Sequence, residues 1–164
     1  MKKRLLIFGI LLSFMLIVST LAGCSLFEAK EKTFTKAGIS ITLTQDFTEE
    51  DYISYTAYYE SRKSVVTIIK EESFLFEPGE FTSLSLREYA DLVIAANTFS
   101  GTVKEKDGLT YFEYEEHVSG KDTSNLIVVY KGSDAFWMVR FVCETKDYKN
   151  LSDTFIKWAK SVTV

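Results

Sequence analysis

Histidine, proline and cysteine are scarce in this chain of 164 residues, which contains one histidine, one proline and two cysteines. A single histidine excludes a metal site built from several histidines. The sequence also lacks a glycine-rich phosphate loop and the patterns His-Glu-x-x-His, Gly-x-Ser-x-Gly and Cys-x-x-Cys. These absences argue against a standard hydrolase, a nucleotide-dependent enzyme and a redox protein.

Acidic residues are missing from the first 23 positions, where Lys2, Lys3 and Arg4 are the only charges. A run of apolar and small residues follows from Leu5 to Leu21. A basic head before an apolar run is typical of an export signal. Because about 17 such residues are also near the lower limit for a helix that crosses a bilayer, an uncleaved membrane anchor is the alternative interpretation.

The tetrapeptide Leu21-Ala22-Gly23-Cys24 ends this run and resembles the lipobox of bacterial lipoproteins. The resemblance implies that residues 1–23 are removed as a signal peptide and that Cys24, the new N-terminus, carries a diacylglyceryl group. Two acyl chains give lasting membrane attachment where one gives only marginal binding. The sequence therefore predicts a protein that is anchored by lipid to the cell membrane and faces outside the cytoplasm.

Removal of residues 1–23 would take away three of the 19 basic residues and none of the 23 acidic ones, which leaves a net charge of −7. A surface of that sign disfavours nucleic acid and anionic lipid headgroups as partners. Lipidation of Cys24 would also leave Cys143 without a partner for an intramolecular disulfide. Cys143 alternates with large apolar residues in an expected strand, which favours a buried, inert thiol.

The mature chain has the length of one ordinary domain. We expect residues 24–33 to form a lipidated N-terminus and tether, and residues 34–164 to form a single domain. Alternating and β-branched patterns, with turns at Ala37-Gly38 and Asp107-Gly108, predict strands in most of it. The expected strands are a hairpin over 34–43 and the segments 52–60, 64–70, 102–107, 109–118, 126–130 and 135–144. Segments 46–51, 71–83 and 120–125 are expected to connect them.

Two helices are expected. Ser85 and Glu88 stand at the spacing of a capping box, ahead of apolar residues at helical intervals. A second amphipathic pattern begins near Asp147 and reaches Val162. Short connections between strands favour antiparallel pairing, and two amphipathic helices are available to cover the sheet. The sequence therefore predicts an α+β fold in which an antiparallel sheet of about six to eight strands is flanked by two main helices.

Five segments together resemble the Mog1/PsbP family, which includes small bacterial lipoproteins of unassigned role. The segments are Ala37–Leu43, Leu86–Ala90, Asp107–Glu115, Ala135–Phe141 and Phe155–Val162. The resemblance implies an α/β/α sandwich over nearly all of residues 34–164. The family has no shared active site, so the resemblance implies a fold and no catalytic residues.

Glu113, Glu115 and His117 share one face of an expected strand and are the only candidates for acid/base or metal chemistry. Alternate residues on a strand are about 6.6 Å apart, which is long for three ligands of one ion. A solvated hairpin face is the simpler interpretation. We therefore expect neither a catalytic residue nor a metal or other cofactor.

Arg140 is a cation at the centre of an otherwise apolar strand. Such an arginine either reaches solvent, pairs with a structural acid or orients an anionic ligand. Tyr55 and Tyr59 lie on one parity of the expected strand 52–60, and tyrosines are common in binding faces. We take Arg140, Tyr55 and Tyr59 as the candidate ligand-binding residues.

The segment 71–83 is expected to be a loop, yet it carries Phe74, Leu75, Phe76 and Phe81. These side chains either fold back onto the sheet or form a lip over a ligand groove. The sequence favours a non-enzymatic binding or assembly-accessory lipoprotein that contacts another envelope protein through a sheet face or this loop. A module that binds a small ligand or a glycan is the alternative, and an enzyme is the least favoured.

Overall fold

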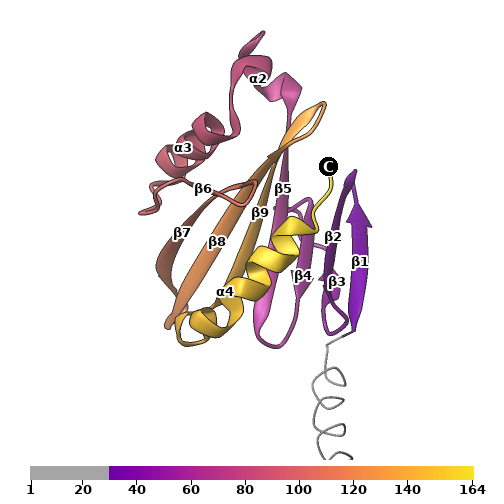
Figure 1. Ribbon diagram of the computed structural model, residues 1–164, viewed down its shortest axis with the longest axis vertical. Coiled ribbons are helices and arrows are strands. Elements are labelled where there is room, and N and C mark those ends of the chain that lie inside the picture. The colour runs from indigo at the N-terminus through magenta and orange to yellow at the C-terminus, as the bar shows by residue number, and fades with distance from the viewer. Residues whose placement is uncertain (1–29) are drawn as a thin grey trace, which may run out of the picture. The chain divides into compact units, whose positions relative to one another are not determined.

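A computed structural model describes residues 30–164 and shows a twisted sheet with helices packed against it (Figure 1). Residues 1–23 and the expected lipidation site at Cys24 lie outside the described residues. The first strand, β1 (Glu31–Lys36), begins inside the segment 24–33 that was expected to be a tether. Within residues 30–164, no helix combines the length and the apolar character needed to cross a membrane.

The remaining elements of the described chain are eight strands, three α-helices and one short 3-10 helix. In chain order they are β2 (Ile39–Thr44), β3 (Thr48–Glu50), β4 (Ala57–Glu60), β5 (Ser64–Glu72), η1 (Ser73–Leu75), α2 (Glu80–Ser83), α3 (Leu86–Asn97), β6 (Lys104–Lys106), β7 (Leu109–Val118), β8 (Lys121–Lys131), β9 (Ala135–Glu144) and α4 (Thr145–Lys160).

Seven strands form one sheet in the order β3-β4-β5-β9-β8-β7-β6, and β1 pairs with β2 in a separate hairpin. Every neighbouring pair is antiparallel. Three of the hairpin turns place consecutive residues at positive φ, as the twist of a tight hairpin favours: Ala37-Gly38, Asp107-Gly108 and Ser119-Gly120. The predicted α+β fold with an antiparallel sheet is confirmed.

Alternation along β9, the central strand, divides the core into two layers. One set of alternating residues, from Ala135 to Cys143, packs with α4 and the β1–β2 hairpin. The other set includes Phe136 and Met138, which pack with α3. We call these two sides of the sheet the α4 face and the α3 face.

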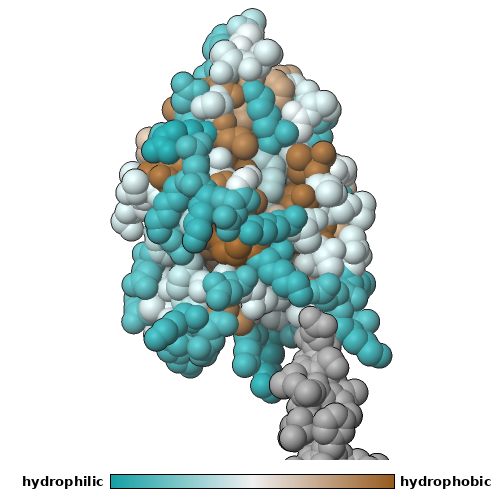
Figure 2. Space-filling view, in the orientation of Figure 1, coloured by the Kyte–Doolittle hydropathy of each residue, from teal (hydrophilic) through white to brown (hydrophobic). Residues whose placement is uncertain are grey.

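α4 covers its face of the sheet because its apolar residues form one stripe. Phe155, Trp158 and Ala159 are buried in this layer, whereas the side of α4 that faces the viewer is mostly hydrophilic (Figure 2). The helix begins two residues before the predicted position, at Thr145, and ends at Lys160. Val162 packs against the core beyond the end of the helix.

α3 starts with the predicted capping box. The Ser85 hydroxyl accepts a hydrogen bond from the Glu88 N–H at 3.2 Å, and the Glu88 carboxylate accepts one from the Ser85 N–H at 2.9 Å. Behind this cap, the Tyr89 ring stacks on Phe136 with 4.2 Å between ring centres. In the described chain, the apolar cluster under α3 takes its strand residues from β7, β8 and β9. The part of the α3 face that β4 and β5 form contributes no residue to this cluster.

Two of the expected connections are wrong. The segment 120–125 is not a turn, because the turn is confined to Ser119-Gly120 and β8 begins at Lys121. The first residues of β8 are polar because they pair with the exposed end of β7. The segment 46–51 likewise contains β3, an edge strand whose residues are all exposed.

Candidate functional site

Arg140 lies on β9 with its side chain on the α3 face, opposite Ile127 of β8 in the sheet register. Its Nε donates a hydrogen bond to Oδ1 of Asn125 at 2.8 Å, and its Nη2 donates to the Glu116 carboxylate. The guanidinium carbon is 5.8 Å from the ring centre of Tyr114, within cation–π range. A structural acid, one of the partners that the sequence left open for Arg140, is therefore present.

A pocket of about 130 Å³ opens beside the guanidinium, near the end of α3. Most of its lining is apolar and comes from β5, β8, β9 and the chain that follows α3. The lining residues are Tyr55, Thr67, Ile69, Asn97, Phe99, Ile127, Met138 and Arg140. Since an engineered apolar cavity of about 150 Å³ holds a benzene molecule, this pocket has room for one ring or one branched side chain.

Two buried polar atoms close to Arg140 have no hydrogen-bond partner among residues 30–164. They are the amide Nδ2 of Asn125 and the hydroxyl of Tyr114. Leaving a buried polar group unpaired costs about 1–3 kcal/mol. Burial raises the pKa of Tyr114 to about 12, so its hydroxyl remains protonated at neutral pH. Two buried groups beside Arg140 that can donate a hydrogen bond therefore remain unpaired.

The predicted placement of Tyr55 and Tyr59 on one face of a strand is wrong. β4 begins only at Ala57, and Tyr55 lies in the preceding turn, where its N–H bonds to the carbonyl of Tyr52 at 3.1 Å. Tyr55 lines the pocket on the α3 face. Tyr59 is instead buried in the core of the α4 face, with its ring centre 4.7 Å from that of Phe34. The period-2 pattern fails because the chain is not extended before residue 57.

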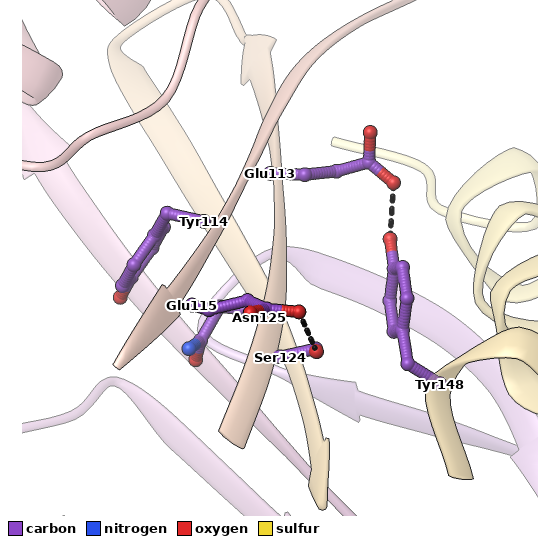
Figure 3. Close-up of a pocket in the computed structure, with 6 residues that line it drawn as sticks. All are labelled: Glu113, Tyr114, Glu115, Ser124, Asn125 and Tyr148. Carbon is purple, nitrogen blue, oxygen red and sulfur yellow. Dashed lines mark hydrogen bonds between the residues drawn. The ribbon is translucent and has the colours of Figure 1, made fainter. Parts of the chain in front are cut away.

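Glu113 faces α4 and not α3. Its carboxylate accepts hydrogen bonds from the hydroxyl of Tyr148 and from the ammonium group of Lys104, and Figure 3 shows Glu113 and Tyr148 pointing toward each other. Burial tends to raise the pKa of Glu113, but these two hydrogen bonds outweigh it and hold the pKa below its usual range. An open pocket of about 260 Å³ lies here, lined by Glu113, Tyr114, Glu115, Ser124, Asn125 and Tyr148.

Glu115 and His117 continue the same face of β7, but each has a separate partner. Glu115 accepts a hydrogen bond from the Ser124 hydroxyl at 3.2 Å, and Nδ1 of His117 lies 2.7 Å from the Asp122 carboxylate. Within the described part of the chain, no three histidine, cysteine or acidic side chains gather as a metal site would require. The three candidates on β7 therefore have separate hydrogen-bond partners, and of the three only Glu113 and Glu115 line the same pocket.

The aromatic segment between β5 and α3 is divided between core and surface. Phe76 and Phe81 pack against Phe136, with ring centres 5.5 and 5.1 Å away. Phe74 and Leu75, in η1, keep 79% and 65% of their surface exposed. The expectation that these side chains fold back onto the sheet therefore holds for the first pair and fails for the second.

No protein-family model and no curated protein matches this sequence. Solved structures do match it. Cyanobacterial PsbP (CyanoP) from Synechocystis sp. PCC 6803 is 12% identical, with a TM-score of 0.57 over 85% of this chain and 95% of its own. The Ran-binding protein Mog1p of Saccharomyces cerevisiae is 9% identical, with a TM-score of 0.52 over 84% of this chain and 96% of its own.

A protein from Bacteroides thetaiotaomicron is similar over a smaller part of its length. It is 10% identical, with a TM-score of 0.55 over 84% of this chain and 49% of its own. Identities this low indicate a common architecture and not a common activity. The chain therefore has the Mog1/PsbP-like fold that the resemblance in its sequence implied.

Proposed function

We propose that this protein is a lipid-anchored accessory module on the outer side of the cell membrane, which binds another envelope protein and catalyses no reaction. The lipobox-like Leu21-Ala22-Gly23-Cys24 supports the anchor and the location. Glu113, Glu115 and His117 each bond to a different partner, which supports a non-enzymatic role, since an acid/base mechanism requires groups that are available to a substrate.

The observation that carries the binding role is the exposure of Phe74 and Leu75. They stand at the tip formed by residues 71–80, which we call the distal tip. Figure 1 shows α2, at the close of this segment, at the opposite end of the sheet from the start of β1. A protein anchored ahead of β1 would hold the distal tip away from the membrane. Burying each of the two side chains in a partner would contribute about 1.5–3 kcal/mol.

Charge indicates the kind of partner that fits the distal tip. Between residues 71 and 83 the chain has four glutamates, Glu71, Glu72, Glu77 and Glu80, and no lysine or arginine. Lys70, just before this segment, already pairs with Glu72 at 2.9 Å. A partner surface complementary to the distal tip is an apolar recess surrounded by lysine and arginine. The glutamates of the tip would repel an anionic lipid surface. We therefore propose a protein partner of that character.

Site-specific photocrosslinking in intact cells tests the docking surface. A benzoylphenylalanine at position 74 should crosslink to one protein, and the crosslinked peptide should contain or adjoin basic residues. Leu92, which is 48% exposed on α3, provides a matched control position. The changes Glu77→Lys and Glu80→Lys should together reduce the crosslink at least about tenfold, through like-charge repulsion. Equal crosslinking from position 92, or indifference to the charge reversal, would contradict the proposal.

The anchor has a separate test. Cys24→Ser should prevent lipidation, so that the protein accumulates as an uncleaved precursor or appears in the soluble fraction. Cell fractionation, with mass spectrometry of the N-terminal peptide, measures both outcomes. Ser25→Ala is the matched control and should leave the mass of the lipidated N-terminus changed only by the substitution. Unaltered partitioning and processing of Cys24→Ser would refute the lipid anchor in favour of an uncleaved helix.

A further inference from the structure

Two residues that line the pocket on the α3 face carry unpaired hydrogen-bond donors. Nη1 of Arg140 has no partner among residues 30–164, and neither has the hydroxyl of Thr67. These two residues are direct neighbours across β5 and β9 in the sheet register. Both line the pocket, so a single ligand group can reach the guanidinium and the hydroxyl together.

The acid that pairs with Arg140 is not among the residues that line the pocket. Glu116 binds Nη2 from β7 and does not line the pocket. Asn125 holds Nε from β8, so two contacts fix the plane of the guanidinium while Nη1 stays unpaired. The unpaired amide of Asn125 and the hydroxyl of Tyr114 lie beside the guanidinium but line the neighbouring pocket at Glu113, so the donors available here are those of Arg140 and Thr67. A guanidinium N–H beside a hydroxyl suits a group that only accepts hydrogen bonds, and a carboxylate is such a group.

The rest of the pocket determines the size and the polarity of the ligand. Its walls are formed mainly by Ile69, Phe99, Ile127 and Met138. An apolar body of about four or five carbon atoms fits a volume of about 130 Å³. The apolar residues and the two donor residues line the same small cavity. A ligand that fills it must therefore carry a hydrogen-bond acceptor directly next to an apolar part.

We propose that this pocket binds a carboxylate attached to a short, branched or cyclic apolar body. Arg140 holds the carboxylate through Nη1, Thr67 donates a second hydrogen bond, and Met138 and Ile127 contact the apolar part. The same chemistry occurs in a free small acid and in the C-terminal residue of a peptide that ends in leucine or valine. The site is independent of the distal tip and of the lipid anchor.

Met138 provides a direct reporter, because the chain has only three methionines and the other two, Met1 and Met15, lie in the predicted signal segment. The full chain, labelled with [13C-methyl]methionine and kept in detergent, is titrated with isovalerate and with isovaleramide, its neutral isostere. The Met138 signal should shift and saturate with the acid, and the amide should bind at least about tenfold more weakly. A Met138 signal that is unmoved by the acid, or that responds equally to both compounds, would overturn the proposal.

The two possible sources of the carboxylate are compared with the peptide Gly-Gly-Leu and its C-terminal amide. Tighter binding of the free-acid peptide than of isovalerate supports a chain end as the ligand, and tighter binding of isovalerate supports a free acid. Saturation of the Met138 shift by the amidated peptide at the same concentration as the free-acid peptide would count against carboxylate recognition.

Variants then assign the donors. Arg140→Gln should weaken the binding of isovalerate at least about tenfold, and Thr67→Val should weaken it several-fold while leaving the contact between Arg140 and Glu116 in place. Arg62→Gln removes an exposed arginine elsewhere and should bind as the unmodified protein does. Thermal unfolding of each variant checks that it is folded. Unchanged binding in a folded Arg140→Gln or Thr67→Val variant would rule out the corresponding donor.

Discussion

Cys143 illustrates how its surroundings determine the chemistry of a single residue. Its side chain is buried on the α4 face of β9, among the apolar residues of the larger core, and its thiol is free. Burial, followed by the negative charge of Asp147, raises the pKa of the Cys143 thiol to about 11. The sequence-based prediction of a buried thiol is confirmed, and a thiol with this pKa has almost no reactive thiolate at neutral pH.

This leads to a prediction for Cys143. At pH 8 its alkylation by iodoacetamide should be at least about a hundredfold slower in the native protein than in urea, because the thiolate is scarce and shielded. Peptide mass mapping measures the rate at this residue alone. A cysteine introduced at the exposed turn residue Ser133 is the control and should react at nearly the same rate in both conditions. Equal native rates at the two positions would show that Cys143 is accessible.

At the scale of an element, ion pairs connect the start of α4 to the sheet. Glu144, which precedes the first residue of α4, pairs with Lys121 of β8 at 2.8 Å and with Lys146 in the first turn. The hydrogen bonds from these two lysines lower the pKa of the Glu144 carboxyl from 4.5 to about 2. The ionised carboxylate is therefore favoured in the folded state relative to the unfolded one.

The sign of the resulting pH dependence follows from the lowered pKa. The contribution of Glu144 to stability is fully present above about pH 4.5 and is lost as the pH falls toward 2. Glu144→Gln should therefore lower the melting temperature at pH 6 and should reduce its fall between pH 5 and pH 3. Thermal unfolding at a series of pH values measures both effects. Asp153→Asn, at an exposed position of the same helix, is the control. An identical pH slope in Glu144→Gln and the unmodified protein would contradict the assignment.

At the scale of the whole described domain, β9 joins the two layers of the core. Phe136 belongs to the cluster under α3, and its neighbours on the strand, Ala135 and Trp137, belong to the cluster under α4. Both tryptophans of the chain lie in the α4-face cluster. Tryptophan fluorescence therefore reports on one layer, whereas circular dichroism reports on all the helices and strands.

Phe136→Ala tests whether the two layers unfold together. The loss of this fully buried ring should reduce the free energy of unfolding by about 3–5 kcal/mol, because a cavity remains beneath α3. The midpoints measured by fluorescence and by circular dichroism in urea should fall by the same amount, since both layers share β9. Phe141→Ala, the matching change on the α4 face, should behave in the same way. Separate midpoints in either variant would mean that the layers unfold independently.

The fold was largely predictable because its signals are local. The capping box at Ser85 and Glu88, the positive-φ turn at Asp107-Gly108 and the alternation along 135–144 each act within a few residues. The errors arose where one residue composition is typical of two kinds of structure. The polar start of β8 resembled a turn, and the tyrosine-rich residues before β4 resembled a strand.

The candidate site could be predicted only in part. Arg140 was identified because a cation in an apolar strand requires a partner, and Tyr55 because tyrosines are common at binding faces. Glu116, Asn125 and Thr67 were missed, since each is an ordinary polar residue in its own strand. Their association with Arg140 depends on the order of β5, β9, β8 and β7 in the sheet and on the register of each pair.

The sequence by itself was enough to predict lipidation at Cys24, the α+β class, the cap of α3 and the inert character of the Cys143 thiol. These features depend on short-range patterns and on side-chain chemistry that any structure of the chain must respect. Only the tertiary structure decided that Glu113, Glu115 and His117 bond to different partners, and that Phe76 packs against the core while Phe74 is exposed. It also decided that Arg140 and Thr67 line one pocket. Strand order and packing bring together residues that are distant in sequence, and no local pattern encodes those distances.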